Sequence, residues 1–88
     1  MANRQYGITI ELELIEEEGN IYDVRVRVCE KITRTRIAGA IVRMAERTEQ
    51  TDVEGDCKFY SIPAGTYSIA VSCDGYKDKA VPVILAHS

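Results

Sequence analysis

The sequence has no long apolar run and no basic run, and each absence excludes a class of function. No stretch reaches the roughly 18 apolar residues of a membrane span. The N-terminal segment MANRQYGITIELELIEEE has no apolar h-region, so we do not expect it to be a signal peptide. Eleven basic and fourteen acidic residues give a net charge of −3, and the five tyrosines are not interleaved with the basic residues. We therefore expect neither a nucleic acid nor a membrane as a partner.

The sequence is also poor in the residues that build catalytic and metal sites. Its three cysteines, Cys29, Cys57 and Cys73, are odd in number and lack the spacing of metal ligands. We expect reduced thiols in or near the core, rather than a disulfide framework or a zinc site. His87 is the only histidine and stands beside the C-terminal residue, so Ser–His and Cys–His pairs have little support. We expect no enzymatic activity, no cofactor and no bound metal.

What the sequence does contain is enough apolar material for one modest core. Its 88 residues are 45% hydrophobic and 28% charged, which is typical of a single globular domain. We expect an N-terminal tail over residues 1–6, a hairpin over residues 7–30, and a core unit over residues 38–86.

Two alternating segments near the N-terminus predict the hairpin. Apolar and polar residues alternate with period two in residues 8–14 and again in residues 24–29. A three-residue loop over residues 18–20 places apolar opposite apolar and acid opposite base, whereas a slip by one residue sets glutamate against valine. The facing pairs are then Leu14–Val24, Leu12–Val26, Ile10–Val28, Glu13–Arg25 and Glu11–Arg27, with Glu17 facing Ile21.

The middle of the chain is less regular. Residues 31–39 carry basic side chains without a clean period and predict a loop. In the next segment Ile37, Ile41 and Met44 fall at helical spacing, but Ala40 and Val42 also alternate as in a strand, so periodicity leaves both open. Residues 51–56 predict a turn whose glycine takes positive φ. The acidic residues of this turn lack the spacing of a calcium-binding loop.

The C-terminal half predicts three strands. Cys57 and Phe59 point to the core and Lys58 and Tyr60 outward. A Pro-Ala-Gly connection over residues 63–65 closes a hairpin to a strand that places Tyr67, Ile69 and Val71 on its buried face. Residues 77–86 form the last strand. Its proline at position 82 cannot donate to a ladder, which favours an edge position.

A series of motifs runs in order through the second half of the chain. They are Ala38-Gly39-Ala40, Thr51-Asp52 with Gly55, Cys57 with Phe59, Pro63-Ala64-Gly65-Thr66-Tyr67, and Gly75-Tyr76. The series resembles the carboxypeptidase regulatory-like domain, a transthyretin-like (prealbumin-like), immunoglobulin-like β-sandwich related to the B-type repeats of bacterial collagen adhesins. This resemblance covers residues 24–85. It implies an all-β sandwich of about seven strands, a strand over residues 40–47, and a buried, inert thiol at Cys57, where the family usually has an aromatic residue.

Two kinds of chemistry occur among relatives of this fold, and this sequence lacks residues that each of them needs. A Lys–Asn isopeptide bond needs an asparagine on the last strand, and residues 77–88 contain none. Hydroxyisourate hydrolases of the transthyretin-like fold carry an N-terminal histidine, a central arginine and a C-terminal Tyr-Arg-Gly-Ser. This chain ends Leu-Ala-His-Ser, so such an enzyme is only a remote alternative.

The resemblance implies binding or structure, with function in loops and exposed faces. We expect a structural or docking module, such as an accessory protein of a virion or tail, which binds a protein assembly or itself. The alternative is a carbohydrate- or peptide-binding accessory domain of a secreted or cell-surface protein. We expect synthesis in the cytoplasm, with the final site open between a virion and an excised extracellular domain. The candidate partner-binding residues are Lys31, Arg34, Arg36, Lys58, Tyr60 and Tyr76.

Overall fold

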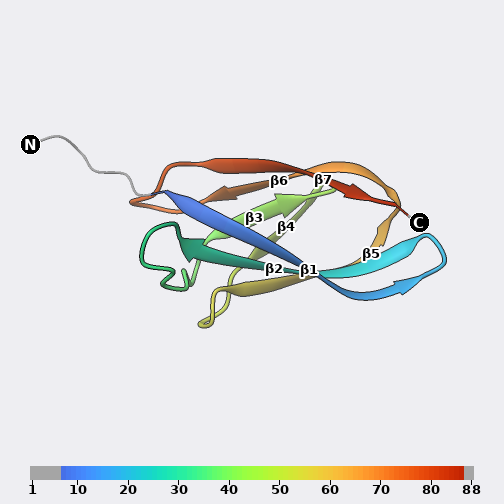
Figure 1. Ribbon diagram of the computed structural model, residues 1–88, viewed down its shortest axis with the longest axis horizontal. Helices are drawn as coiled ribbons and strands as arrows, with labels where there is room; N and C mark the ends of the chain where they lie inside the picture. Colours follow the sequence, from blue (N-terminus) through green and yellow to red (C-terminus); the bar gives the residue numbers. More distant parts are fainter. Residues whose placement is uncertain (1–6, 87–88) are drawn as a thin grey trace, which may run out of the picture.

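Seven β-strands make up the part of the chain that the computed structural model describes, residues 7–86 (Figure 1). The strands are β1 (Ile8–Glu18), β2 (Ile21–Glu30), β3 (Ile41–Met44), β4 (Arg47–Gln50), β5 (Asp56–Pro63), β6 (Gly65–Ser72) and β7 (Lys79–Leu85). They form two antiparallel sheets, one in the order β1-β2-β5 and the other in the order β4-β3-β6-β7. The predicted all-β sandwich of seven strands is confirmed. Residues 7–86 contain no helix long and apolar enough to cross a membrane.

The register of the β1–β2 hairpin follows the prediction over its central part. Every predicted pair between residues 10–14 and residues 24–28 occurs, so acid faces base on one side of the sheet and apolar faces apolar on the other. Val24, Val26 and Val28 are fully buried. The complementary side chains therefore select this register, as expected when one face of a strand pair enters a core.

The turn of this hairpin differs from the prediction. Glu18 pairs with Ile21, so only residues 19–20 lie between the strands, and the predicted three-residue loop with Glu17 facing Ile21 is wrong. Glycine at position 19 has a φ of 63°, as a tight two-residue turn requires. The register shifts by one at Ile15, which is the extra residue of a β-bulge. Because of the bulge, residues 10–14 pair with residues 24–28 as predicted, although the turn is one residue shorter.

The ambiguous segment after the basic loop is a second hairpin. β3 and β4 pair with each other, and Ala45 and Glu46 form the turn between them with φ values of 54° and 63°. The prediction of a strand in place of a helix is confirmed, but the continuous strand expected over residues 40–47 ends at Met44. Val42 and Met44 point into the core and are buried, which explains why the period-two pattern prevails over the helical one.

The connection from β5 to β6 crosses between the sheets, so the hairpin predicted around residues 63–65 is wrong. β5 pairs with β2, whereas β6 pairs with β3 and β7, and only Ala64 lies between the two strands. A bulge in β5 precedes the crossing, where Ser61 has a φ of 58° and its amide donates to the Asp23 carboxylate at 2.9 Å. Bulges bend and twist a strand, and this one turns β5 toward the opposite layer.

The core lies between the inner faces of the two sheets. Cys57, Phe59, Ile69 and Val71 are buried as predicted, and Tyr67 is half-buried. β7 forms an edge of its sheet, which confirms the position expected from its proline. The buried residues that pack together in this core are Ile8, Tyr22, Val24, Val26, Val28, Ile37, Ala40, Val42, Met44, Cys57, Phe59, Ile62, Ile69, Val71, Val83 and Leu85.

One polar side chain ties the basic loop to the following turn from within the protein. Thr51 is 4% exposed, and its hydroxyl accepts a hydrogen bond from the Ala40 amide at 2.8 Å and donates to the Ile37 carbonyl at 2.7 Å. The predicted turn after it is confirmed, with φ of 80° at Gly55. One oxygen of the Asp52 carboxylate accepts hydrogen bonds from the Glu54 and Asp56 amides, which holds this turn together.

Candidate functional site

The basic candidate residues lie in the loop between β2 and β3. An Arg34 guanidinium nitrogen lies 3.8 Å from a carboxylate oxygen of Glu11, and the Arg36 guanidinium donates to the Glu54 carbonyl at 3.0 Å. Both arginines thus contact their own chain, while Lys31 is exposed near the start of the loop. Ion pairs this exposed contribute little to stability. The loop remains accessible, but it does not form a preorganised anion site.

Lys58 and Tyr60 lie on the outer face of β5, as predicted, and both are exposed. Lys58 faces Arg25 across the strands, and Arg25 in turn forms an ion pair with Glu13 on β1. These side chains make one row of charges across the three-stranded sheet. The backbone carbonyl of Tyr60 accepts a hydrogen bond from Arg47 of β4, so this tyrosine also marks the junction of the two sheets.

A second row of charges on the same face contains the ion pair between Arg27 of β2 and Asp56 of β5. The Arg27 guanidinium donates to the Asp56 carboxylate with a nitrogen–oxygen distance of 2.9 Å. This hydrogen bond lowers the pKa of Asp56 and raises that of Arg27. Acid, base and acid alternate along this row, from Glu11 through Arg27 to Asp56, whereas in the first row Arg25 faces a second base, Lys58. The second row therefore supports the register of all three strands, and the first supports that of β1 with β2.

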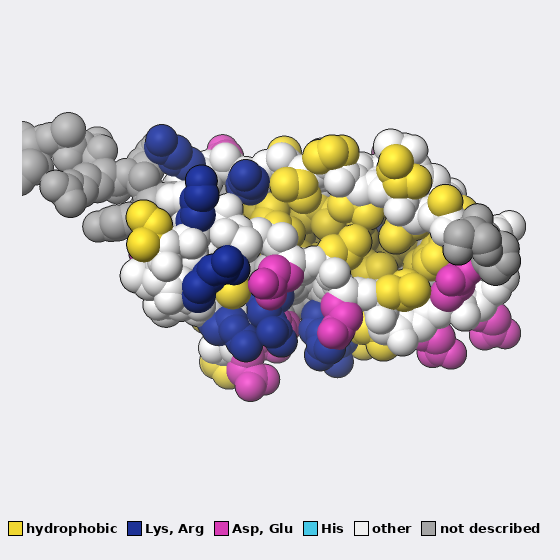
Figure 2. All heavy atoms as spheres, in the orientation of Figure 1, with side chains coloured by type: hydrophobic (Ala, Val, Ile, Leu, Met, Phe, Trp, Pro, Cys, Tyr) yellow, Lys and Arg dark blue, Asp and Glu magenta, His cyan; other side chains and the backbone are white. Residues whose placement is uncertain are grey.

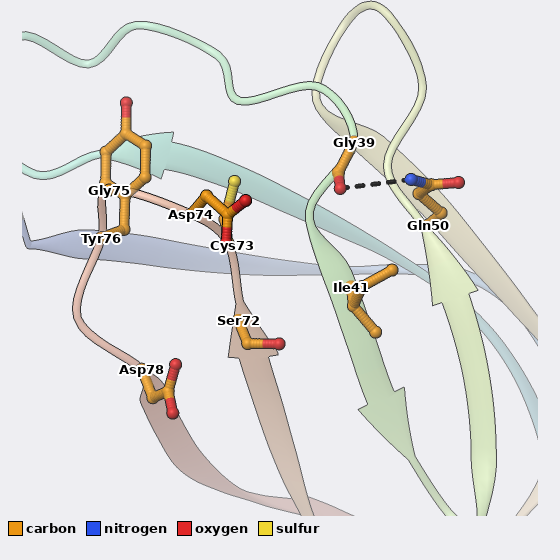
Figure 3. Close-up of a pocket in the computed structure, with 9 residues that line it drawn as sticks. All are labelled: Gly39, Ile41, Gln50, Ser72, Cys73, Asp74, Gly75, Tyr76 and Asp78. Atoms are coloured by element: carbon orange, nitrogen blue, oxygen red, sulfur yellow. Dashed lines mark hydrogen bonds between the residues drawn. The ribbon is translucent and has the colours of Figure 1, made fainter.

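Tyr76 lies in the β6–β7 loop at the rim of an open depression of about 590 Å³ (Figure 3). Its hydroxyl donates to the Glu30 carboxylate at 3.4 Å, and on the opposite rim Gln50 donates to the Gly39 carbonyl at 3.3 Å. The lining residues are Gly39, Ile41, Gln50, Ser72, Cys73, Asp74, Gly75, Tyr76 and Asp78. The structure thus places Tyr76 in a polar depression, apart from Lys58 and Tyr60.

The chemistry available in this depression is limited to weak hydrogen bonding and stacking. Its titratable groups include Cys73, Asp74 and Asp78, which come from the end of β6 and the loop that follows (Figure 3). Within residues 7–86, no group of three or more histidine, cysteine, aspartate or glutamate side chains is placed to hold a metal ion. His87, which a hydrolase-like site would need, lies outside the described residues.

The three thiols are free, and those of Cys29 and Cys57 are buried. Burial raises the pKa of Cys57 to about 12, and the acidic neighbours Glu49, Asp52 and Asp56 add to the effect. A thiol with so high a pKa is a poor nucleophile at neutral pH, because the thiolate is the reactive form. The expectation of a buried thiol at Cys57 is confirmed.

An exposed apolar surface lies where the two sheets open, and the sequence-based candidates do not include it. Along the inner face of β1, Ile8 is buried, but Leu12 is 39% exposed and Leu14 is 51% exposed. Their partners Val24 and Val26 on β2 remain fully buried. The exposed fraction of the inward-facing side chains therefore rises along β1 but not along β2, because β1 extends past the edge of the opposite sheet.

Figure 2 shows this surface as an apolar hollow between β1 and β7, the edge strands of the two sheets. We call it the apolar mouth and define it by the residues that line the depression of about 350 Å³ at its end. They are Leu12, Leu14, Glu17, Tyr22, Val24, Ile84, Leu85 and Ala86. Burial raises the pKa of Tyr22, and the neighbouring Glu17 carboxylate raises it further, so an acidic group borders the apolar lining.

The opposite side of the sandwich is closed. There β4 and β5 contact each other, and the Arg47 guanidinium donates to the backbone carbonyls of Tyr60 and Ser61. The second of these hydrogen bonds measures 3.3 Å. Arg47 therefore links the two sheets on this side, whereas on the side of β1 and β7 part of the apolar inner face of the sandwich is exposed.

Comparison of the chain with protein-family models, with curated proteins and with solved structures finds no match. The resemblance to carboxypeptidase regulatory-like domains accordingly stays a prediction.

Proposed function

We propose that this protein is a non-catalytic β-sandwich that docks onto another protein chain as a component of a larger assembly. The observation that supports this function is the apolar mouth. Its lining includes Leu12, Leu14 and Ile84, which are 39%, 51% and 72% exposed. Contiguous exposed apolar surface beside a free strand edge is typical of a protein interaction site.

The finer parts of the proposal rest on the sequence. The motif series over residues 24–85 resembles the carboxypeptidase regulatory-like and transthyretin-like sandwiches, whose members serve as spacers and docking modules. We accordingly place the protein among accessory components of an assembly such as a virion or tail. Function on such a fold resides in its faces and loops.

A second candidate function comes from the depression beside Tyr76. The depression is lined by the ring of Tyr76, the carboxylates of Asp74 and Asp78 and, on the opposite rim, the amide of Gln50. Together they offer the mixture of stacking and hydrogen bonding that a sugar requires. This supports the alternative of a carbohydrate-binding accessory domain. It involves a different surface from the mouth, so one experiment separates the two.

Site-specific photo-crosslinking in the organism that makes the protein tests the docking function. A photoreactive residue at position 14 lies in the mouth, whereas one at Val53, which is 90% exposed in a turn, serves as the control. We expect position 14 to crosslink to a protein that also co-purifies in a stable complex, and the double variant Leu14→Lys/Ile84→Lys to abolish that complex. Equal labelling from both positions, together with glycan binding that Tyr76→Ala abolishes, would favour the carbohydrate function instead.

A further inference from the structure

The first strand has one edge that pairs with no strand of residues 7–86. β1 spans 11 residues and hydrogen-bonds to β2 along one side. Alternate amide and carbonyl groups on its other side are left for a further strand. On β7, the edge strand across the mouth, Pro82 removes one of the donors that such a ladder needs. Between the two edges, β1 is therefore the better acceptor of an added strand.

The outer face of β1 is strongly acidic. Residues 11–18 contain five glutamates and no basic residue. Glu11 and Glu13 lie near arginines of the same chain, but Glu16 and Glu18 line a depression with Asp23, another acid. A strand that adds to this edge must bring positive charge on its outer face.

The strand already paired with β1 shows which sequence complements it. Arg25 and Arg27 of β2 face Glu13 and Glu11, and the alternating Val24 and Val26 face Leu14 and Leu12. The acceptable pattern is thus an alternation of apolar and basic residues. A second copy of the protein does not fit, because pairing β1 with β1 sets glutamate beside glutamate, and like charges across a strand pair are destabilising.

We infer that the apolar mouth receives an extended segment of a different protein, with alternating apolar and basic residues, which adds to β1 as a fourth strand of its sheet. The apolar side chains of this segment cover Leu12 and Leu14 and fill the mouth, while its basic side chains lie along the glutamates. Strand addition of this kind combines main-chain hydrogen bonds for affinity with alternate side chains for specificity. The inference rests on the proposed docking function and assigns the chemical class of its partner.

Three synthetic peptides of about nine residues, the length of a strand, test the inference. The first alternates valine and arginine, the second alternates valine and glutamate, and the third has the composition of the first with its valines and arginines in two blocks. Each is titrated into the whole protein at about 150 mM salt, where long-range attraction is screened. Backbone amide NMR shifts report both affinity and location.

We expect the alternating arginine peptide to shift the amides of β1 and β7 and to bind more tightly than the other two. The double variant Glu16→Lys/Glu18→Lys should weaken that binding about tenfold and give the glutamate peptide measurable affinity. The variant Leu14→Lys should weaken the binding of both the arginine peptide and the glutamate peptide. All these positions are exposed on β1, so the variants should fold, and far-ultraviolet circular dichroism checks this.

The outcomes separate the partner class from the function. Equal binding of the block peptide would overturn strand addition, since only net charge would then matter. Equal binding of the glutamate peptide to β1 would overturn the basic class but leave docking in place. If no peptide binds and the crosslink from position 14 is also absent, both the inference and the docking function fail.

Discussion

The buried hydroxyl of Thr51 offers the sharpest test of how the loops are held on the sandwich. We expect Thr51→Val, which keeps the shape of the side chain but removes the hydroxyl, to destabilise the protein strongly. The change leaves the Ala40 amide and the Ile37 carbonyl without their partner at 2.8 Å and 2.7 Å. Both residues are buried, so water does not replace the lost hydrogen bonds without local opening.

The expected magnitude follows from the two groups left behind. A buried polar group that loses its partner costs about 1–3 kcal/mol, so for the two groups the loss on Thr51→Val is about 2–6 kcal/mol. In a domain of this size, each kcal/mol lowers the melting temperature by roughly 4–8 °C. The matched control Thr51→Ser retains the hydroxyl and loses one methyl group, which costs about 1 kcal/mol.

Thermal and urea unfolding measure the difference. The chain has five tyrosines and no tryptophan, so tyrosine fluorescence and far-ultraviolet circular dichroism are suitable probes. Amide exchange at Ala40 should accelerate in Thr51→Val and stay slow in Thr51→Ser. If Thr51→Val melts at or above the temperature of Thr51→Ser, the hydroxyl does not anchor this turn and the reasoning is refuted.

Three further changes test other parts of the structure. Gly55→Ala should lower the urea midpoint at least twice as much as Gly75→Ala. Both glycines have positive φ, but only at Gly55 would the new methyl meet a backbone oxygen at 3.0 Å, and equal effects would contradict the packing. The hydrogen bond from Arg27 lowers the pKa of Asp56 below 3.8. The ionised Asp56 therefore stabilises the folded protein above pH 3.8, and this contribution to the free energy of unfolding is lost as the pH falls through the lowered pKa. In Asp56→Asn, the free energy of unfolding should fall less steeply with acid in unfolding titrations. Iodoacetamide at about pH 8 should alkylate half-exposed Cys73 and spare Cys57, as peptide mass spectrometry would show, and equal labelling would argue against the buried thiol.

Alternation along the chain is sufficient to predict the strands and the faces they bury. Phe59, Ile69 and Val71 lie in the core as expected, because a half-buried strand alternates its side chains between two environments. The same pattern does not specify which strand is the neighbour. A hairpin and a crossing between sheets both bury alternate residues, and for this reason the connection through Ala64 was predicted incorrectly.

The candidate surface was harder to predict than the fold. Arg34, Arg36 and Tyr76 were selected as exposed polar groups, and the structure shows each in contact with its own chain. The apolar mouth has no local sequence signature, because Leu12 and Leu14 alternate just as core residues do. Their exposure depends on where the opposite sheet ends, which is a long-range property of the packing.

The bulge at Ile15 gives the N-terminal hairpin a place where its length can change. Deleting Ile15 would join two stretches that already have consistent pairing, so every facing pair on either side would be kept. Deleting Glu13 instead would move all preceding residues by one position and place their apolar side chains on the charged face. Insertions and deletions in this strand are therefore tolerated at one position and excluded at its neighbours, and the spacing of the glutamates along the edge can vary without disturbing the core.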